Sequence, residues 1–450
     1  MQDGKDRIAF VHLGCAKNLV DAEVMAGHLR EAGYEIASGT ECADVVIVNT
    51  CGFISDAREE AVDAILAAVE PGEDGRIPAV IAAGCLAQRY PEQLREGIPE
   101  LAGIIGVNDI HQISGVVAGA LAGGHPLRVS NDVEAAGGPG KRFRWTPRHY
   151  RYLKIAEGCD RRCNYCAIPL IRGPYRSRPA AEILREAAAL VDDGARELNL
   201  VAQDVTRYRD PATGMGLNEL LGSLAEAFVD TWIRILYAHP AGIDESLVET
   251  ILRHDNIAPY LDVPLQHASP RILAAMGRPE DPERVRDFLT RLRRNHPQFS
   301  LRSTFLVGFP GETGADFELL LDRVAALQLD DAAVFPFSPE EGTPAHSLPG
   351  VVPGGVARDR ANQLGEVIER ASFEAKQRFV GRMLSVVLDK YRDEVWMGRH
   401  PGQAPEIDGA VIIPGVDEGV KGLEPGVRLE VEIEAADSID LWGRIRRKLV

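Results

Sequence analysis

EGCDRRCNYC, residues 157–166, holds three of the chain's seven cysteines: Cys159, Cys163 and Cys166. Three more cysteines are spread over the N-terminal third, at intervals of 36 and 34 residues: Cys15, Cys51 and Cys85. A buried iron–sulfur cube is normally held by four cysteine thiolates. A set of three leaves one iron without a protein ligand, and such an iron can bind and react with a further group. The two sets therefore predict two reactive clusters.

The segment 157–166 has two alternative interpretations as a less reactive site: a zinc ion with a distant fourth ligand, and a plain ferredoxin-like cluster. Zinc knuckles favour paired C-x-x-C units, whereas here a gap of three residues precedes a gap of two. The seventh cysteine, Cys42, belongs to neither set, and we expect it to pack as a small hydrophobic residue.

Length, composition and charge set broad limits. A chain of 450 residues predicts two to four domains, and 45% hydrophobic with 26% charged residues is ordinary for globular proteins. The sequence has no apolar run of roughly 18 residues and no signal-peptide pattern at its start, so we expect a cytoplasmic protein without membrane contact. The net charge of −17 disfavours polyanionic partners and favours basic ones, although solubility alone explains it equally well.

The first segment, residues 6–125, alternates predicted strands with predicted helices, which is typical of a parallel sheet covered by helices. Each interval between its cysteines is about one strand–helix–strand unit. Cys15, Cys51 and Cys85 should therefore lie just beyond the carboxyl ends of neighbouring strands, the edge at which such sheets bind ligands. The strands are RIAFVHLG, VVIVNT, AVIAAG and GIIGV.

A loop rich in Gly and Pro, residues 126–147, leads to a second segment, 148–378, with six further strand–helix repeats. Six repeats suggest a partial (β/α)6 barrel, whose active groups should lie at the carboxyl ends of its strands. The last segment, 380–450, has short strands broken by Gly and Pro and predicts a small β-barrel. The six strands of the second segment are YLKIAEG, ELNLVAQ, WIRILYA, YLDVPLQ, LRSTFLVG and DAAVFPF.

The pattern C-x-x-x-C-x-aromatic-C at 159–166 resembles the radical S-adenosylmethionine (SAM) superfamily. The resemblance implies that Cys159, Cys163 and Cys166 hold a 4Fe–4S cluster whose open iron binds SAM. Reductive cleavage of SAM then yields a 5′-deoxyadenosyl radical, which abstracts an unactivated hydrogen that acid–base catalysis could not remove. The radical arises at this cluster, and no catalytic side chain is assigned. By the same resemblance Tyr165 packs near the adenine, unless it is simply a buried aromatic residue.

GCAKN (14–18), NTCGF (49–53) and GC (84–85) resemble the N-terminal domain of radical SAM methylthiotransferases. The last segment resembles a TRAM domain, so the resemblance spans nearly the whole chain. It implies a second 4Fe–4S cluster on Cys15, Cys51 and Cys85, whose open iron carries the sulfur. One SAM methylates that sulfur, and a second SAM generates the radical.

Several further residues are candidates for contacts with SAM or substrate. Gln203, Asp204 and Gly308, the last in GFPGE (308–312), stand where the superfamily contacts SAM, although GFPG is also a common turn. Asp262 and His267 are expected to be pocket or structural residues, because radical abstraction needs no acid–base pair. The arginines after the cluster loop either meet the carboxylate of SAM or of the substrate, or cap loop carbonyls: Arg172, Arg176 and Arg178.

Methylthiotransferases modify either tRNA adenosine or an aspartate of ribosomal protein uS12. YLDVPLQHAS (260–269) and APEIDG (404–409) resemble the ribosomal-protein branch. Residues 381–450 carry ten Lys/Arg against thirteen Asp/Glu, whereas a module that grips tRNA phosphates should be basic. RIRRK (444–448) argues the other way, unless it is a solvated edge strand.

We therefore predict an α/β protein that uses two 4Fe–4S clusters and SAM to modify an aspartate of uS12. Its expected partners are uS12 or the small ribosomal subunit, an electron donor such as flavodoxin or ferredoxin, and a sulfur donor. Under the alternative, a tRNA adenosine methylthiotransferase, the partner is tRNA. A third hypothesis is a metal-stabilised ribosome-binding or electron-carrier protein that does not cleave SAM.

Overall fold

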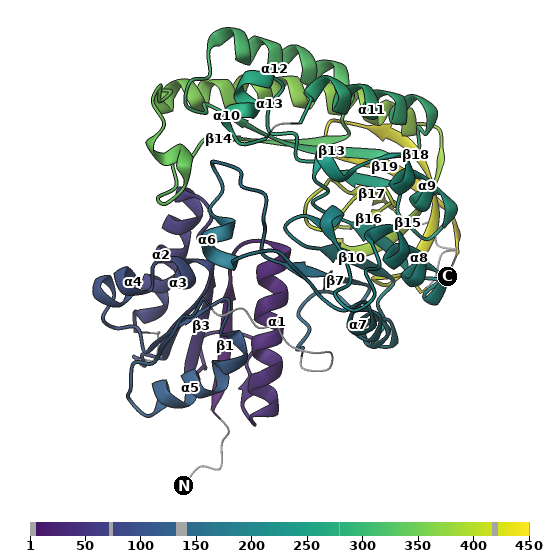
Figure 1. The fold of residues 1–450 in the computed structure, drawn as a ribbon. Helices are drawn as coiled ribbons and strands as arrows, with labels where there is room; N and C mark the ends of the chain where they lie inside the picture. Colours follow the sequence, from purple (N-terminus) through teal and green to yellow (C-terminus); the bar gives the residue numbers. More distant parts are fainter. Residues whose placement is uncertain (1–5, 72–74, 132–141, 279, 416–421, 450) are drawn as a thin grey trace.

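The computed structural model describes residues 6–71, 75–131, 142–278, 280–415 and 422–449. Three units follow one another along the chain in Figure 1: a purple N-terminal sheet with helices, a teal and green central unit, and a yellow barrel. The middle of the predicted linker, residues 132–141, lies outside the described residues. The mixed α/β fold class is confirmed.

The N-terminal unit is a six-stranded parallel sheet in the order β2-β1-β3-β4-β5-β6. All six residues of β3 are buried, as expected for a strand covered on both faces. The strands are β1 Arg7–His12, β2 Glu35–Ile36, β3 Val45–Thr50, β4 Ala79–Gly84, β5 Gly103–Gly106 and β6 Leu127–Arg128. The helices are α1 Ala16–Glu31, α2 Ser55–Val69, α3 Cys85–Arg89, α4 Pro91–Gly97 and α5 Ile113–Leu121. The predicted strands are therefore present.

The central unit has six parallel strands in two three-stranded sheets, β11-β10-β7 and β12-β13-β14. The backbone N–H of Ala258 donates to the carbonyl of Ile233, and that of Ala238 to Asp262, both at 2.8 Å. These bonds join the two sheets into the partial barrel that the repeats predicted. Its strands are β7 Tyr150–Lys154, β10 Glu197–Val201, β11 Trp232–Ile235, β12 Tyr260–Asp262, β13 Ser300–Val307 and β14 Asp331–Pro336.

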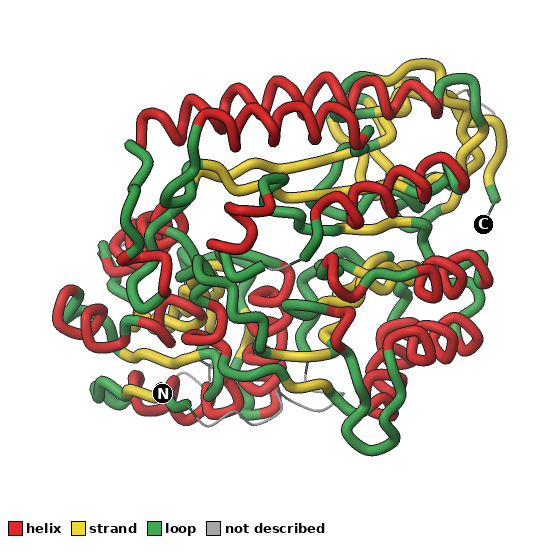
Figure 2. The backbone as a smooth tube through the Cα atoms, turned by 45° about the horizontal axis from the view of Figure 1, so that its top comes forward, coloured by secondary structure: helices red, strands yellow, loops and turns green. Residues whose placement is uncertain are grey.

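Helices cover the outside of this barrel, as Figure 2 shows, while a two-stranded ladder, β8 Ala156–Glu157 with β9 Arg176–Ser177, flanks the cysteine loop. The helices are α6 Ile168–Arg172, α7 Ala180–Asp192, α8 Leu217–Ala227, α9 Glu245–Arg253, α10 Pro270–Ala275, α11 Pro282–Asn295, α12 Gly314–Leu327 and α13 Gly354–Lys376. No helix in the described part of the chain is long and apolar enough to cross a membrane.

The C-terminal unit is a closed barrel in the order β15-β16-β17-β19-β18. β19 pairs with β17 only at Leu441 and Trp442, whereas its pairing with β18 continues to Lys448. RIRRK is therefore paired on one side only and its Arg and Lys side chains are exposed, as expected for a solvated edge. β16 was not predicted. The strands are β15 Met383–Arg392, β16 Val395–Arg399, β17 Val411–Pro414, β18 Arg428–Ala436 and β19 Leu441–Lys448.

The APEIDG segment (404–409) fastens this barrel to the central unit. The Glu406 carboxylate accepts hydrogen bonds from the hydroxyls of Tyr150 (2.8 Å) and Tyr152 (3.1 Å). Asp408 accepts from the Arg302 guanidinium at 3.1 Å. These contacts fix the barrel relative to β7 and β13, so the segment has a structural role in domain docking.

Candidate functional site

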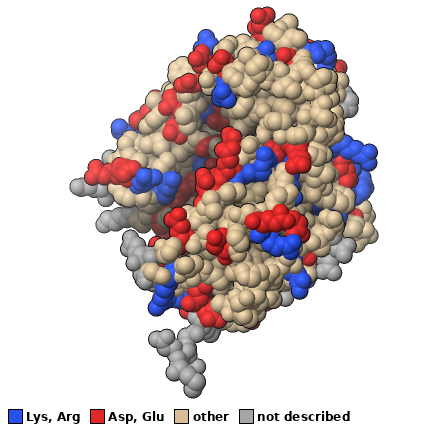
Figure 3. All heavy atoms as spheres, turned by 90° about the vertical axis from the view of Figure 1, so that its left-hand side faces the viewer, with Lys and Arg blue, Asp and Glu red and all other residues tan. Residues whose placement is uncertain are grey.

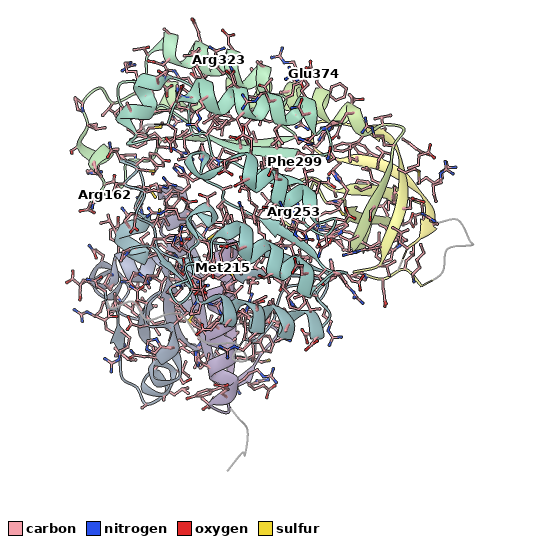
Figure 4. The ribbon with its side chains drawn as sticks, turned by 45° about the vertical axis from the view of Figure 1, so that its right-hand side comes forward. Arg162, Met215, Arg253, Phe299, Arg323 and Glu374 are labelled. Carbon is pink, nitrogen blue, oxygen red and sulfur yellow. The ribbon has the colours of Figure 1, made fainter. Side chains whose placement is uncertain are left out.

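The cluster loop of the central unit follows β8 and is held by backbone contacts. Gly158 has a φ of +74°, and a Cβ at this position would lie 2.1 Å from the carbonyl oxygen of Pro174, so only glycine fits before Cys159. The Cys159 N–H donates to Gly173 (3.1 Å), and the Asn164 N–H donates to Met276, just after α10 (2.8 Å). The loop is therefore pinned on two sides. Figure 4 places Arg162, which belongs to it, where the central unit approaches the N-terminal unit.

The N-terminal cysteines lie beyond the carboxyl ends of three adjacent strands. Cys15 precedes α1, Cys51 directly follows β3, and Cys85 begins α3 directly after β4. A Cβ added to Gly14 would lie 3.6 Å from the Cys51 Sγ. The charges of Cys15 and Cys51 both act on Cys85, so the three thiols occupy one region. The three cysteines therefore meet at this edge of the sheet, as their spacing along the sequence predicted.

Arg172 links the two cysteine regions. It lies in α6, shortly after the cluster loop, and its Nη2 donates to the Sγ of Cys85 at 3.3 Å. Its Nη1 lies 2.9 Å from carboxylate oxygens of both Asp21, on α1, and Glu157, on β8. These contacts join the N-terminal unit to the central unit between the two sets of cysteines. Among the described residues, Arg172 thus contacts a cysteine and two structural carboxylates and no loop carbonyl.

Lys154 completes this buried ionic network. Its amine contacts Glu157 at 2.7 Å and also pairs with Asp21. Glu157 accepts a further hydrogen bond from Gln203 Nε2 at 2.7 Å. Burial alone would raise the pKa of Glu157, but Arg172 and Lys154 outweigh burial and hold that pKa well below its usual value. The glutamate therefore stays ionised, and two cations are balanced by two carboxylates.

The pKa values of the six thiols in the two cysteine sets are not all shifted in the same direction. Burial raises the pKa of Cys85 to about 11 and that of Cys166 to about 12, and it raises the pKa of the other two thiols in the cluster loop and of Cys51. Cys15 is exposed to solvent, but the surrounding protein desolvates its thiol, which favours a higher pKa. The positive charges of Lys17 and Arg172 outweigh this effect and lower the pKa of Cys15. Iron binds thiolates, so loading the buried set releases protons.

The two sets of three thiols are the donor type that iron–sulfur cubes take. In the part of the chain that the structure describes, no three His, Cys, Asp or Glu side chains are grouped to hold one metal ion. A cube binds each thiolate to a different iron, so its ligands lie further apart than those of one ion.

The predicted SAM-contacting residues lie around the cluster loop. Asp204 accepts a hydrogen bond from Arg161 of that loop at 2.9 Å and caps the short 3-10 turn that follows β10. Tyr165 packs against an apolar cluster that includes Leu273 and Phe309, and burial raises its pKa. Gly308 follows β13, and its N–H donates to the Glu312 carboxylate at 2.8 Å, which closes the GFPGE turn.

The other candidates have structural partners. Arg176 donates to the carbonyls of Pro174 and Arg172, as the capping alternative predicted. Arg178 instead donates to the strand carbonyl of Lys154 and to the Glu186 carboxylate at 2.7 Å. His267 accepts from the Ser269 N–H at 2.9 Å. Burial raises the pKa of Asp262, which accepts from the Tyr237 N–H at 3.1 Å.

Cys42 does not pack inside the protein. It is exposed, in a turn before β3 that is closed by a hydrogen bond from the Ala43 N–H to Thr40. The expectation that it behaves as a buried hydrophobic residue is wrong, because the strand that would carry it inward begins only at Val45.

Sequence reasoning missed Lys17 and Tyr237. Lys17 is 8% exposed, and its amine lies 3.6 Å from the centre of the Tyr237 ring. Tyr237 has a φ of +64°, a strained conformation for a bulky residue and one that is common at functional sites. Lys17 stands inside the GCAKN motif, so a signal existed, whereas nothing local marks Tyr237.

Replacing Gly308 by alanine should destabilise the turn beside the cluster loop. Its φ is +76°, and a Cβ would lie 2.5 Å from the Cβ of Ala357 on α13. We expect the free energy of unfolding to fall by about 3 kcal/mol, measured by chemical denaturation. Gly314→Ala is the matched control, because no atom beyond its chain neighbours and the backbone of its own helix lies within 4 Å of its Cβ position. Equal stability of the two variants would contradict this account of the turn.

Three protein-family models match successive parts of the chain. Residues 7–106 match Uncharacterized protein family UPF0004, residues 153–324 the radical SAM superfamily, and residues 380–445 the TRAM domain. The solved structure of a radical SAM methyltransferase, TsrM, from Kitasatospora setae is similar, with a TM-score of 0.55, 15% identity and coverage of 76% of this chain and 77% of that one. At 15% identity, this similarity shows that the two chains share a fold and nothing further.

The barrel, the cysteine loop and these matches define a radical SAM enzyme with an appended TRAM barrel. The chain is 43% identical over 446 residues to ribosomal protein uS12 methylthiotransferase RimO of Desulforudis audaxviator, covering 98% of this chain and 97% of the relative. It is 40% identical over 450 residues to that of Geobacter sulfurreducens, covering 99% and 100%. The chain belongs to the RimO family of methylthiotransferases, whose cofactors are two 4Fe–4S clusters and SAM.

Proposed function

We propose that this chain adds a methylthio group to the β carbon of an aspartate of ribosomal protein uS12. One observation carries the proposal: the two cysteine regions meet across Arg172, which follows one set and contacts Cys85 of the other at 3.3 Å. A sulfur-carrying cluster and a radical-generating cluster would then serve one substrate. The relatives named above are uS12 methylthiotransferases and match over nearly their whole length.

The chain's own residues would hold and orient these groups. Cys159, Cys163 and Cys166 would bind one cluster, and Cys15, Cys51 and Cys85 the other. When bound, the clusters and SAM supply the radical that removes a hydrogen from the substrate carbon and the methylthio group that replaces it. Gln203, Asp204, Gly308 and Tyr165 surround the first cysteine set and would position SAM. The ion pairs of Arg172 fix the separation of the two edges.

We assign these tasks to separate segments of the chain. Residues 6–125 would carry the auxiliary cluster, residues 148–378 the radical chemistry, and residues 380–450 the contact with substrate, with 126–147 as a linker. An electron donor such as flavodoxin or ferredoxin would supply the reducing equivalents, and a separate sulfur donor would replace the transferred sulfur. Because these proposed partners and uS12 are cytoplasmic components, we infer that the reaction takes place in the cytoplasm.

The barrel surface favours a protein substrate over tRNA. The basic run on β19 is paired with carboxylates of β18, so its charge is largely balanced: Arg444 with Glu434, Arg446 with Glu432, and Arg447 with Glu430. Figure 3 shows a different face of the molecule, the left-hand side of Figure 1 away from the barrel, which is hollowed and carries interspersed acidic and basic side chains. A surface that binds tRNA phosphates should carry Lys and Arg side chains that are not already paired with carboxylates.

Incubation with each substrate tests this assignment. The reconstituted enzyme is incubated anaerobically with reductant, sulfide, SAM and either uS12 or bulk tRNA, and both products are analysed by mass spectrometry. We expect a methylthio gain on one uS12 aspartate and none on tRNA. A gain on tRNA adenosine alone would contradict the substrate assignment but keep the chemistry. Absence of 5′-deoxyadenosine would contradict the chemistry itself.

A further inference from the structure

An open groove runs between α2 and α4, on the face of the N-terminal sheet opposite to α1 and the central unit. Both helices lie on the left-hand side of Figure 1, the side that Figure 3 turns towards the viewer. The groove has a volume of about 690 Å³, within the range of ligand sites. Its apolar lining consists of Val62, Leu66, Leu86, Tyr90, Leu94 and Ile98. Leu66 is 44% exposed, so apolar surface is open to a partner.

The rim of this groove carries carboxylates without partners. Glu59 and Asp63 line the groove from α2, where a spacing of four residues places them on one side of the helix. Both are exposed, and no ion pair joins either carboxylate to any of the described residues. The arginines of the two helices are already engaged, Arg58 with Glu340 and Arg95 with a glutamate of its own helix. An apolar floor with a negatively charged rim is therefore available to a basic protein partner.

One end of the groove lies at the cysteine edge of the N-terminal sheet. Ser55, at that end, follows Cys51 by four residues, and its N–H donates to the Ser338 hydroxyl at 3.3 Å. Ser338 follows β14, at the carboxyl rim of the central barrel. Leu86, on the groove wall, directly follows Cys85. A polypeptide that lies in the groove is therefore next to the junction of the two units, beside the N-terminal thiols.

We propose that this groove binds a basic, partly apolar segment of uS12 and so anchors the substrate beside the two cysteine sets. The choice of uS12 rests on the proposed function. Ribosomal proteins contact RNA phosphates through Lys and Arg side chains, and a segment of that kind complements the carboxylates of α2. The same carboxylates repel tRNA phosphates, and a second copy of this chain, with its net charge of −17, is also repelled. The groove is then a substrate contact additional to the C-terminal barrel.

Charge reversal at the rim tests the groove in the reconstituted holoenzyme. We expect Glu59→Lys with Asp63→Lys to raise the dissociation constant of uS12 by about 10-fold to 100-fold, because two attractive charges become repulsive. The measurement is fluorescence anisotropy of labelled uS12 at about 0.15 M salt, where distant charges are screened. The KM for uS12 should rise by a similar factor while kcat changes by less than about 2-fold, since no cluster ligand is altered. Leu66→Gln, which leaves the charge unchanged, should raise the dissociation constant by about 3-fold to 10-fold.

Glu318→Lys with Asp322→Lys is the matched control. These two residues repeat the same residue types at the same spacing on α12, and both are exposed. Figure 4 labels Arg323, the neighbour of Asp322, at the end of the molecule opposite to the N-terminal unit. Because the net charge changes equally in both double variants, the control separates the groove from the overall charge. Its affinity for uS12 should stay within about 2-fold of that of the unmodified enzyme.

The proposal is overturned if the groove variants bind uS12 as tightly as the control does. Unchanged uS12 binding together with slower SAM cleavage by reduced flavodoxin, but not by dithionite, would assign the groove to the electron donor instead. Binding is measured without turnover, so it is independent of the reaction. An unmodified enzyme that binds uS12 without modifying it would contradict the proposed function alone, and the comparison of variants would still decide on the groove. Absence of uS12 binding by the unmodified enzyme would overturn both.

Discussion

Replacing Cys159, Cys163 and Cys166 together by alanine is expected to abolish 5′-deoxyadenosine formation and to remove about four of about eight irons per chain. The cofactor carries the difficult step, so no residue of the remaining chain can substitute for it. The measurement is iron content after anaerobic reconstitution, followed by chromatography of the reaction with SAM and dithionite.

The fold around the cluster loop should survive this change. The loop is fixed by backbone hydrogen bonds, such as those from the N–H groups of Cys159 and Asn164, which alanine retains at the first position. Arg172 keeps its pairing with Asp21 and Glu157. Lost activity would therefore reflect a lost cluster and not unfolding, which circular dichroism would verify.

Cys42→Ala is the matched control for this experiment. Cys42 is exposed and lies in a turn outside both cysteine sets. Its replacement should change neither iron content nor SAM cleavage. Retention of full SAM cleavage by the triple variant would contradict the assignment of the radical-generating cluster.

The strands that carry the cysteines were predictable because they are apolar runs at a steady interval. VVIVNT and AVIAAG are buried over most of their length, so hydrophobic patterning alone located β3 and β4. β16 was missed for a local reason: its hairpin turns through Asp393 and Glu394, both with positive φ, where Asn-Gly would have given a clear signal. α3, five residues long, is too short to show a helical period.

The ionic network was much less predictable. Glu157 and Lys17 stand within the quoted motifs, but most of their partners lie on other elements, such as Arg172, Gln203 and Tyr237. Pairing of that kind depends on tertiary packing. The sequence identified Arg172 as a possible carboxylate or carbonyl partner, and the structure adds its contact with Cys85. Exposure of Cys42 likewise depends on where a turn ends and a strand begins.

Replacing Cys15, Cys51 and Cys85 together by alanine is expected to separate the two chemistries. Iron content should again fall by about four per chain, but SAM cleavage should continue while methylthiolation of uS12 stops. The reason is geometric: these thiols stand at the edge of the N-terminal sheet, whereas the cluster loop is held by Gly173 and Met276 of the central unit.

The contacts of Arg172 determine whether SAM cleavage can survive the loss of the N-terminal thiols. Without the Cys85 Sγ it loses one contact, yet Asp21 and Glu157 still balance its charge and hold α6 beside the cluster loop. Iron analysis, 5′-deoxyadenosine formation and mass spectrometry of uS12 on the same preparation distinguish the outcomes. Unchanged iron content would contradict the second cluster. Loss of SAM cleavage together with methylthiolation would show that the central unit depends on the N-terminal thiols, against the contacts that hold its loop.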